Sequence, residues 1–260
     1  MKKKKSTFAR IAIPCAIAAA AAANAVRAAR FVPEKKDYGT LSPENVDAER
    51  AQRNLSKAIS IPTISYPEKE KVDFTQFDKF HEFLDEAYPL IHKTLTKEVI
   101  CEASLMYCWK GTRSDLDPIA LLAHQDVVPI SEGTEGDWEH PPFEGYNDGE
   151  FIWGRGALDM KNHLIGVMEA VETLLEEGFT PERDVYLLFG QDEEVVASGD
   201  SGARHMMETL KERGIHLDCI IDAGGAILPV NIKGLLENKD LVGVGIAETG
   251  YTDLALSVSA

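Results

Sequence analysis

Three apolar stretches of the chain each run into side chains that can carry charge. "PIALLAHQDVV" reaches His124 and Asp126, "DVYLLFGQDEE" ends in Glu193 and Glu194, and "LDCIIDAGG" contains Asp222. The first stretch is apolar on both faces, which is typical of an internal strand in a sheet that is covered on both sides. In open α/β sheets the ligand crevice lies beyond the carboxyl ends of the strands. The sequence therefore predicts an α/β fold with a functional site at one edge of the sheet.

Amphipathic helices accompany these strands. The first is expected to open with Ser42 as N-cap and Pro43 at its first position, with Val46, Leu55 and Ile59 on one face. Two further helices carry apolar residues at helical spacing, Phe77, Phe80, Leu84 and Tyr88 in one and Leu164, Met168, Val171 and Leu175 in the other. Strands that alternate with helices favour a three-layer α-β-α domain with a mainly parallel mixed sheet.

The charge of the chain is distributed unevenly along its length. Residues 1–30 contain seven Lys or Arg and no acid, whereas residues 31–260 contain 20 basic against 43 acidic residues, a formal charge of −23. A surface that binds phosphates needs the opposite sign. We therefore expect no nucleic-acid partner, and the acidic part of the chain suits the binding of cations.

Residues 1–30 are predicted to be a signal peptide or an N-terminal membrane anchor. A lysine cluster is followed by an uncharged, alanine-rich run over residues 11–26, with a candidate A-x-A cleavage site at residues 23–25. The run is shorter and less apolar than the roughly 20 residues of a typical spanning helix. We expect an exported protein, either secreted or membrane-anchored through residues 8–29, because a cytosolic alanine helix would not explain the lysine cluster.

A cluster of carboxylates around one imidazole is predicted at the edge of the sheet. Asp159, in "GRGALDMKN" at the start of a helix, joins the acids at the strand ends and His124. Five carboxylates at one edge would repel one another strongly without a cation between them. The three cysteines after the leader, which we expect to be buried thiols, show no CxxC spacing for a thiolate site; they are Cys101, Cys108 and Cys219. One imidazole with several carboxylates suits a catalytic centre for zinc or another first-row divalent ion.

Each residue of this cluster can be given a role at such a centre. His124 would bind a metal ion through one ring nitrogen, and Asp126, two residues on and on the same face, would hold the ring from behind. Asp159 would bridge two ions about 3.5–4 Å apart, an arrangement used for hydrolysis. Glu194 would be a metal ligand, and Glu193 would be the general base. Asp222 would be a ligand of the ion on the His124 side.

Five short blocks resemble, in order and spacing, those of a dinuclear zinc peptidase family: "HQDVVP", "WEHPPF", "GRGALDMK", "FGQDEEV" and "IDAGG". That family contains carboxypeptidase S, the N-acyl amino acid hydrolases, aminoacylase and bacterial glutamate carboxypeptidase. The second and fourth blocks are most similar to the carboxypeptidase S and N-acyl amino acid hydrolase branch. The resemblance covers the chain from roughly residue 40 to residue 260.

The resemblance implies zinc-dependent hydrolysis of amide bonds in small peptides or N-acyl amino acids that carry a free carboxylate. It implies one zinc bound by His124, Asp159 and Asp222, and a second bound by Asp159 and Glu194, with Co²⁺ or Mn²⁺ as substitutes. Glu193 would be the catalytic base. The resemblance also implies that the peptide bond after Asp159 is cis.

The resemblance also divides the chain into domains. After residues 1–30 it implies an incomplete zinc peptidase catalytic domain over residues 31–245 and the first strand of a lid or dimerisation domain over residues 246–260. In the family the chain returns after the lid to supply one more histidine ligand. A chain ending at Ala260 is therefore expected to bind about one zinc tightly and to hydrolyse N-acyl amino acids poorly. The alternative is a catalytically inactive fragment or a metal-binding module.

Overall fold

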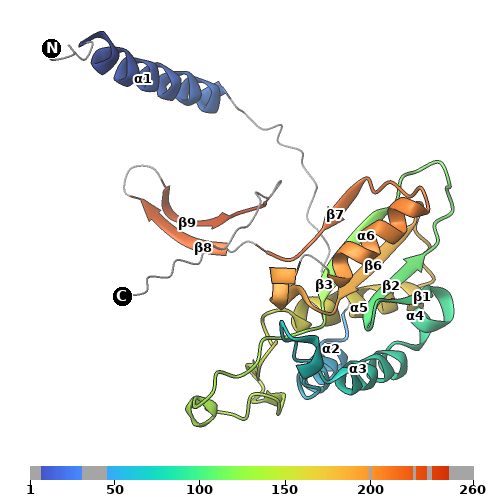
Figure 1. Ribbon diagram of the computed structural model, residues 1–260. Helices are drawn as coiled ribbons and strands as arrows, with labels where there is room; N and C mark the ends of the chain where they lie inside the picture. Colours follow the sequence, from blue (N-terminus) through green and yellow to red (C-terminus); the bar gives the residue numbers. More distant parts are fainter. Residues whose placement is uncertain (1–6, 31–45, 199–200, 225–226, 233–235, 246–260) are drawn as a thin grey trace. The chain divides into compact units, whose positions relative to one another are not determined.

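The computed structural model describes residues 7–30, 46–198, 201–224, 227–232 and 236–245 of the chain (Figure 1). The chain divides into two compact units, Met1–Asn45 and Val46–Ala260. In the first unit, Thr7–Arg30 forms the helix α1. Among the described helices, none combines the length and apolarity that crossing a membrane requires. The signal peptide or anchor at residues 1–30 stays a prediction.

The second unit is built on a five-stranded sheet with the strand order β1-β2-β6-β3-β7. The strands are β1 (Thr96–Ile100), β2 (Ser104–Trp109), β3 (Ile119–His124), β6 (Val185–Gly190) and β7 (Cys219–Ile221). Strand β3 runs parallel to β6 and to β7, whereas β2 is antiparallel to both β1 and β6. The predicted α/β fold with a mixed sheet is therefore confirmed, and its parallel pairing is confined to β6, β3 and β7.

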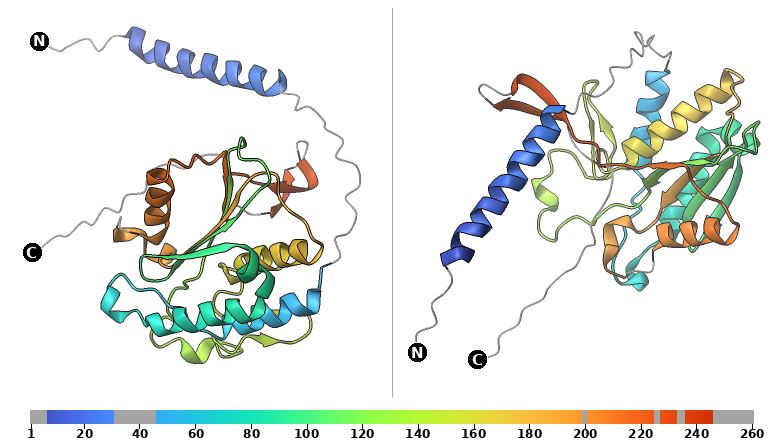
Figure 2. Two further views of the ribbon diagram at one scale, coloured as in Figure 1. Left: turned by 90° about the vertical axis from the view of Figure 1, so that its right-hand side faces the viewer. Right: turned by 90° about the horizontal axis from the view of Figure 1, so that it is seen from above.

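Helices cover both faces of this sheet (Figure 2). One face packs against α2 (Ala48–Ile59), α3 (Phe74–Ala87), α4 (Pro89–Thr94) and α5 (Lys161–Glu176), and the other packs against α6 (Gly202–Glu212). The two faces alternate along each strand, because neighbouring side chains of a strand point to opposite sides. In β6, for example, Leu187 and Phe189 face the four-helix side and Leu188 faces α6. The result is the three-layer α-β-α arrangement that the sequence predicts.

The structure corrects the predicted start of the first of these helices. Helix α2 begins at Ala48 rather than at Pro43, and Val46 lies before the helix with 54% of its surface exposed. The carboxylate of Asp47 accepts a hydrogen bond from Arg50 N at 2.9 Å, so Asp47 is the N-cap. The predicted N-cap Ser42 lies outside the described residues. Helices α3 and α5 lie where their periodicity predicts them.

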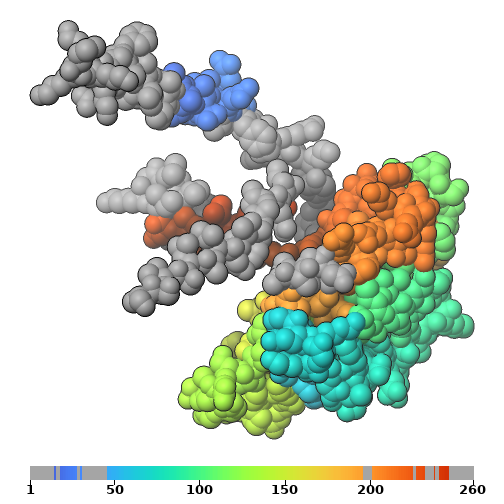
Figure 3. Space-filling model, in the orientation of Figure 1, coloured from blue at the N-terminus to red at the C-terminus, as the bar shows by residue number. Residues whose placement is uncertain are grey.

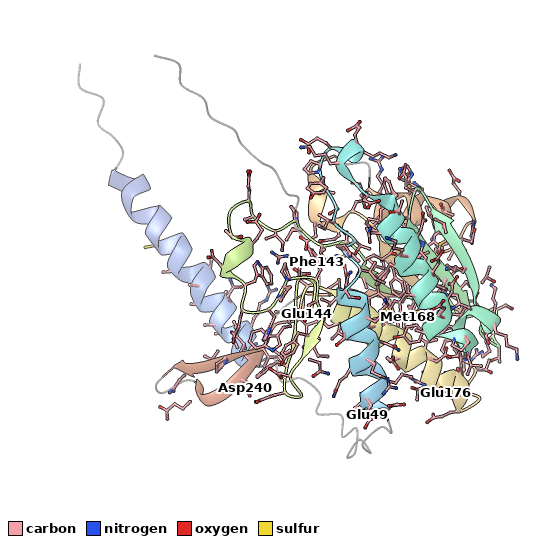
Figure 4. All side chains as sticks on the ribbon, turned by 90° about the horizontal axis from the view of Figure 1, so that it is seen from below. Glu49, Phe143, Glu144, Met168, Glu176 and Asp240 are labelled. Atoms are coloured by element: carbon pink, nitrogen blue, oxygen red, sulfur yellow. The ribbon has the colours of Figure 1, made fainter. Side chains whose placement is uncertain are left out.

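A buried polar network joins α5 to α2 and to the loop before α4. Glu169 of α5 is 3% exposed and accepts hydrogen bonds from Arg50 at 2.7 Å, Asn54 at 2.7 Å and Tyr88 at 3.0 Å. Arg50 also binds the exposed Glu176, near the end of α5 (Figure 4), at 2.6 Å. Apolar spacing alone would place the glutamates of α5 on its solvent face. Glu169 and Glu172 are nevertheless buried, because α2 and α4 pack on that side of the helix.

Replacement of Glu169 by alanine is expected to lower the free energy of unfolding by about 2 kcal/mol, because it leaves Arg50, Asn54 and Tyr88 without their shared acceptor. Arg50 keeps 20% of its side chain exposed and can rehydrate, which places the loss below that of a fully buried pair. Glu176→Ala is the matched control, because it removes an exposed partner of the same arginine and should cost at most about 1 kcal/mol. Urea denaturation measures both, and equal losses would contradict the assignment.

The remaining described elements are small. Strands β4 (Tyr146–Asn147) and β5 (Ile152–Trp153) pair within a loop region, which projects as a lobe in Figure 3. The hairpin of β8 (Ile227–Ile232) and β9 (Leu236–Val242), which we did not predict, forms a separate two-stranded sheet. The predicted lid strand over residues 246–260 lies outside the described residues. The cysteines at 101 and 219 are exposed, so the expectation of buried thiols is wrong for them.

Candidate metal centre

The parallel strands bring the predicted site residues to one edge of the sheet. Strand β3 ends at His124, which pairs with Gly190 at the end of β6, and the 3-10 helix η3 (Glu193–Ser198) follows shortly after. Strand β7 ends one residue before Asp222. A cavity of about 640 Å³ lies at this edge, and its lining includes His124, Asp159, Glu193 and Asp222. Of the four ligands expected from the sequence, His124, Asp159 and Asp222 line this cavity together with the expected base Glu193, whereas Glu194 is not among its lining residues.

His124 lies at the centre of the cluster. Its Nε2 atom is 3.1 Å from Asp159 Oδ1 and 3.7 Å from Glu193 Oε2. One ligand atom each from His124, Glu193 and Glu194 lie within 4.8 Å of one another, close enough to hold one metal ion. Glu194 therefore lies close to His124 and Glu193, although it does not line the cavity. Asp222 lies on the cavity wall, where its carboxylate accepts a hydrogen bond from the neighbouring Ala223 N at 2.7 Å.

Asp126 is completely buried and contacts both His124 and the backbone of the two glutamates. Its carboxylate lies 3.3 Å from His124 Nδ1, and its main-chain oxygen lies 2.9 Å from the same ring nitrogen. The carboxylate also accepts hydrogen bonds from Glu193 N and Glu194 N, each at 3.1 Å, and from Ser65 Oγ at 2.6 Å. One buried carboxylate therefore holds both the imidazole and the backbone from which the two glutamates project.

Asp159 reaches the cluster from the turn that precedes α5. Its side chain is 76% exposed, so it lies at the open side of the site. The peptide bond between Asp159 and Met160 is cis, as the resemblance implies. Gly156 in the same turn has a φ of +83°, and a Cβ atom there would lie 2.7 Å from Val127 Cγ1. The turn therefore requires glycine at this position, for its backbone conformation and for the space beside Val127.

The electrostatics of the cluster favour a cation. Burial raises the pKa of Glu193, and the charges of Asp126, Asp159 and Asp222 raise it further. Burial and the neighbouring acids likewise raise the pKa of Glu194. A carboxylate pKa raised in this way shows that further negative charge is unfavourable at the site. One imidazole among carboxylates, with no cysteine among the described residues that line the cavity, is a donor set that fits zinc.

Three buried polar residues that the sequence reading did not single out support the cluster. They are Ser65, Gln125 and Lys161. Gln125 donates to the carbonyl oxygens of Ala103 and Phe189, at 2.9 Å each, and so fixes the end of β3 to the neighbouring β6 and to the residue that precedes β2. Lys161 carried a signal in the sequence. It opens α5, where a positive charge opposes the helix dipole, and such a position needs compensating contacts elsewhere.

Comparison with known proteins places this chain in a family. Residues 120–244 match the model of the peptidase family M20/M25/M40. A probable carboxypeptidase S-like protein of Dictyostelium discoideum is 40% identical over 241 residues, covering 88% of this chain and 45% of that protein. Carboxypeptidase S of Saccharomyces cerevisiae is 41% identical, covering 78% of this chain and 36% of its own length. The chain therefore belongs to the M20 peptidase family, a family of metallopeptidases.

Within this family the chain is similar to the branch that the sequence blocks indicate. An N-fatty-acyl-amino acid synthase/hydrolase of Danio rerio is 37% identical over 224 residues, covering 85% of this chain and 42% of that protein. The chain thus spans less than half the length of these relatives. Among solved structures, an M20 family metallo-carboxypeptidase from Sulfolobus solfataricus shares the fold, with a TM-score of 0.54 at 18% identity over 68% of this chain and 38% of that chain.

Proposed function

We propose that this protein hydrolyses amide bonds of small peptides or N-acyl amino acids at a zinc centre. The observation that carries the proposal is the convergence of His124, Asp159, Glu193 and Asp222 on one cavity at the carboxyl ends of three parallel strands. The names of its relatives, carboxypeptidase S and N-fatty-acyl-amino acid synthase/hydrolase, support amide substrates that carry a free carboxylate. Membership of a family of metallopeptidases supports the use of metal.

The ligand set proposed for zinc divides into two groups that share Asp159. His124, Asp159 and Asp222 would hold one ion, and Asp159 with Glu194 would hold the other. Zinc, when bound, lowers the pKa of water and polarises a carbonyl group. Asp126 contributes by fixing the His124 ring through Nδ1, which directs Nε2 toward the cavity.

Glu193 is proposed as the general base. Its carboxylate lies on the cavity wall, and its raised pKa brings it closer to the range in which a carboxylate exchanges protons efficiently at neutral pH. It would take a proton from the attacking water and pass it to the leaving nitrogen as the amide bond breaks. The hydrogen bond that Glu193 N donates to Asp126 Oδ1 holds the backbone of this residue, so that the side chain is presented to the cavity from a fixed position.

Zinc titration of the chelator-treated full chain, paired with an assay on a simple N-acyl amino acid, tests this function. We expect tight binding of about one zinc ion and slow hydrolysis that is lost with a chelator and restored by zinc. Hydrolysis that persists in excess chelator would contradict a metal centre. Failure to bind zinc at micromolar concentrations would contradict the ligand assignment.

Zinc binding is expected to release about one proton from His124 at pH 7.5, because a metal binds only the neutral imidazole. Burial alone lowers the pKa of His124, but the hydrogen bond to Asp126 and the charges of Asp126 and Glu193 raise it from 6.5 to about 9. The zinc affinity should therefore increase as the pH rises from 6.5 to about 9. Calorimetry in buffers of different ionisation enthalpy measures the proton release, and a pH-independent affinity would contradict it.

The same shift sets the pH dependence of stability in the zinc-free chain. Because folded His124 binds its proton more tightly than the unfolded chain does, the stabilisation is complete below pH 6.5 and is lost as the pH rises toward about 9. Thermal denaturation in chelator should show this loss. If a His124→Asn variant shows no such loss of stability with rising pH, the loss is due to the His124 ring.

We also propose that residues 1–30 direct export, with membrane association through residues 8–29. The lysine cluster and the alanine-rich run support this, as does the helical conformation of residues 7–30 in α1. A reporter fused behind residues 1–30 should leave the cytosol, and replacement of the four lysines at positions 2–5 should prevent it. A reporter that stays in the cytosol with the lysines intact would contradict export. The family resemblance also implies a homodimer formed through the lid domain, and light scattering tests for it.

A further inference from the structure

Lys161 is a completely buried lysine that the proposed hydrolysis does not use. Its Nζ atom donates hydrogen bonds to the carbonyl oxygens of Ala58 at 2.8 Å and Ile61 at 2.6 Å. It also lies 5.0 Å from the centre of the Phe80 ring, in a cation–π contact. Among the described ion pairs, none involves this ammonium group. A buried charge without a carboxylate in contact is costly, so the contacts of Lys161 are what compensate its burial.

The carbonyl groups that Lys161 binds belong to the end of α2 and to the segment that follows it. This segment, residues 61–65, lies alongside the end of β3 as a strap. Thr63 Oγ1 donates to Gln125 O at 2.6 Å, and Val127 N donates to Thr63 O at 3.0 Å. Ser65 Oγ donates to the Asp126 carboxylate at 2.6 Å. The strap is therefore hydrogen-bonded to the backbone and side chains that directly follow His124, including the Asp126 carboxylate.

Lys161 itself belongs to the part of the site that carries Asp159. It follows Asp159 by two residues and opens α5, and its backbone N donates to Gly156 O at 2.9 Å within the turn that carries Asp159. A Cβ atom on Gly156 would lie 3.4 Å from Lys161 Cδ, so the turn is packed directly on the lysine stem. The ammonium group thus joins the Asp159 turn to the strap, and the strap joins it to the end of β3.

We propose that Lys161 is a positioning residue, which sets the separation of His124 and Asp159 by tying the Asp159 turn to the strap at residues 61–65. The two ligands come from segments 35 positions apart, and the Nε2–Oδ1 distance of 3.1 Å between them depends on how those segments are held. A metal site tolerates little error in the placement of its ligands. This inference rests on the proposed zinc centre and adds a residue that holds its geometry without touching the metal.

Lys161→Met is the direct test, because it keeps the length of the side chain and removes the ammonium group. Its zinc dissociation constant, measured by calorimetry on the full chain, is expected to rise about 10-fold, the lower end of the effect of residues that orient metal ligands. The visible absorption spectrum of the cobalt-loaded chain should change as well, since it reports the geometry of the ligands. Lys57→Met is the matched control, because Lys57 is exposed near the end of the same α2 and should alter neither measurement.

A lysine that only stabilises the fold would give a different result. Lys161→Met would then lower the melting temperature and leave the zinc affinity and the cobalt spectrum of the folded protein unchanged, which would overturn the proposal while the zinc centre stands. If Lys161→Met does not fold, Thr63→Val decides. It removes the hydroxyl bond from the strap to Gln125 O at nearly constant volume, and an unchanged affinity and spectrum would overturn the proposal. Absence of zinc binding by the unsubstituted chain would overturn both this inference and the proposed function.

Discussion

Replacement of Glu193 by glutamine is expected to lower kcat for an N-acyl amino acid about 1,000-fold, within the range that general acid–base catalysis typically supplies. Glutamine keeps the shape of the side chain and cannot take a proton from water. Glu193 lines the cavity and lies 3.7 Å from His124, so its carboxylate is within reach of a water beside the ligands. Steady-state kinetics measures the loss, and zinc calorimetry on the same variant shows whether the metal is retained.

The zinc affinity of each variant shows whether the replaced glutamate is a general base or a metal ligand. Glu193→Gln should keep most of its zinc affinity, whereas Glu194→Gln should weaken zinc binding by about 10-fold or more, since it removes a charged ligand. Glu177→Gln, at an exposed position at the end of α5, is the matched control for both measurements. The structure makes this comparison informative, because Glu193 and Glu194 both lie within ligand distance of His124. Equal loss of zinc in the two variants would show that Glu193 is a ligand.

The location of the site could be predicted from the sequence because it depends on local patterns. Apolar runs that end in acids identify strands, and the parallel pairing of β6, β3 and β7 follows from helices placed between them. Parallel strands place their carboxyl ends at one edge, so His124, Glu193 and Asp222 had to meet once the strands were assigned. The cis bond after Asp159 came from the family resemblance alone, since no local pattern predicts it.

The supporting contacts could not be predicted because they join segments far apart in the chain. Asp126 and Ser65 are separated by 61 positions, and Lys161 and Ala58 by 103. No periodicity relates such pairs. The start of α2 was misplaced for a different reason. Pro43 and Asp47 are both good residues for the start of a helix, and tertiary packing selects between such local preferences.

Asp126 has the most demanding position in the site, because its single carboxylate satisfies several groups in a region without exposure to solvent. It accepts hydrogen bonds from Glu193 N, Glu194 N and Ser65 Oγ and lies 3.3 Å from His124 Nδ1. All of these groups can act as donors. An asparagine in its place has one acceptor oxygen and one amide group that can only donate. Whichever way the amide turns, a donor faces a donor at a buried position.

Asp126→Asn is therefore expected to weaken zinc binding about 100-fold and to lower the free energy of unfolding by about 2 kcal/mol. The affinity falls because the His124 ring and the Glu193–Glu194 backbone lose the group that orients them together. Urea denaturation in chelator gives the stability, and calorimetry on the folded variant gives the affinity. Asp78→Asn, at an exposed position on α3, is the matched control and should leave both values unchanged. A variant that binds zinc as tightly as the unsubstituted chain would show that Asp126 only stabilises the fold, and that the ligands hold their positions without it.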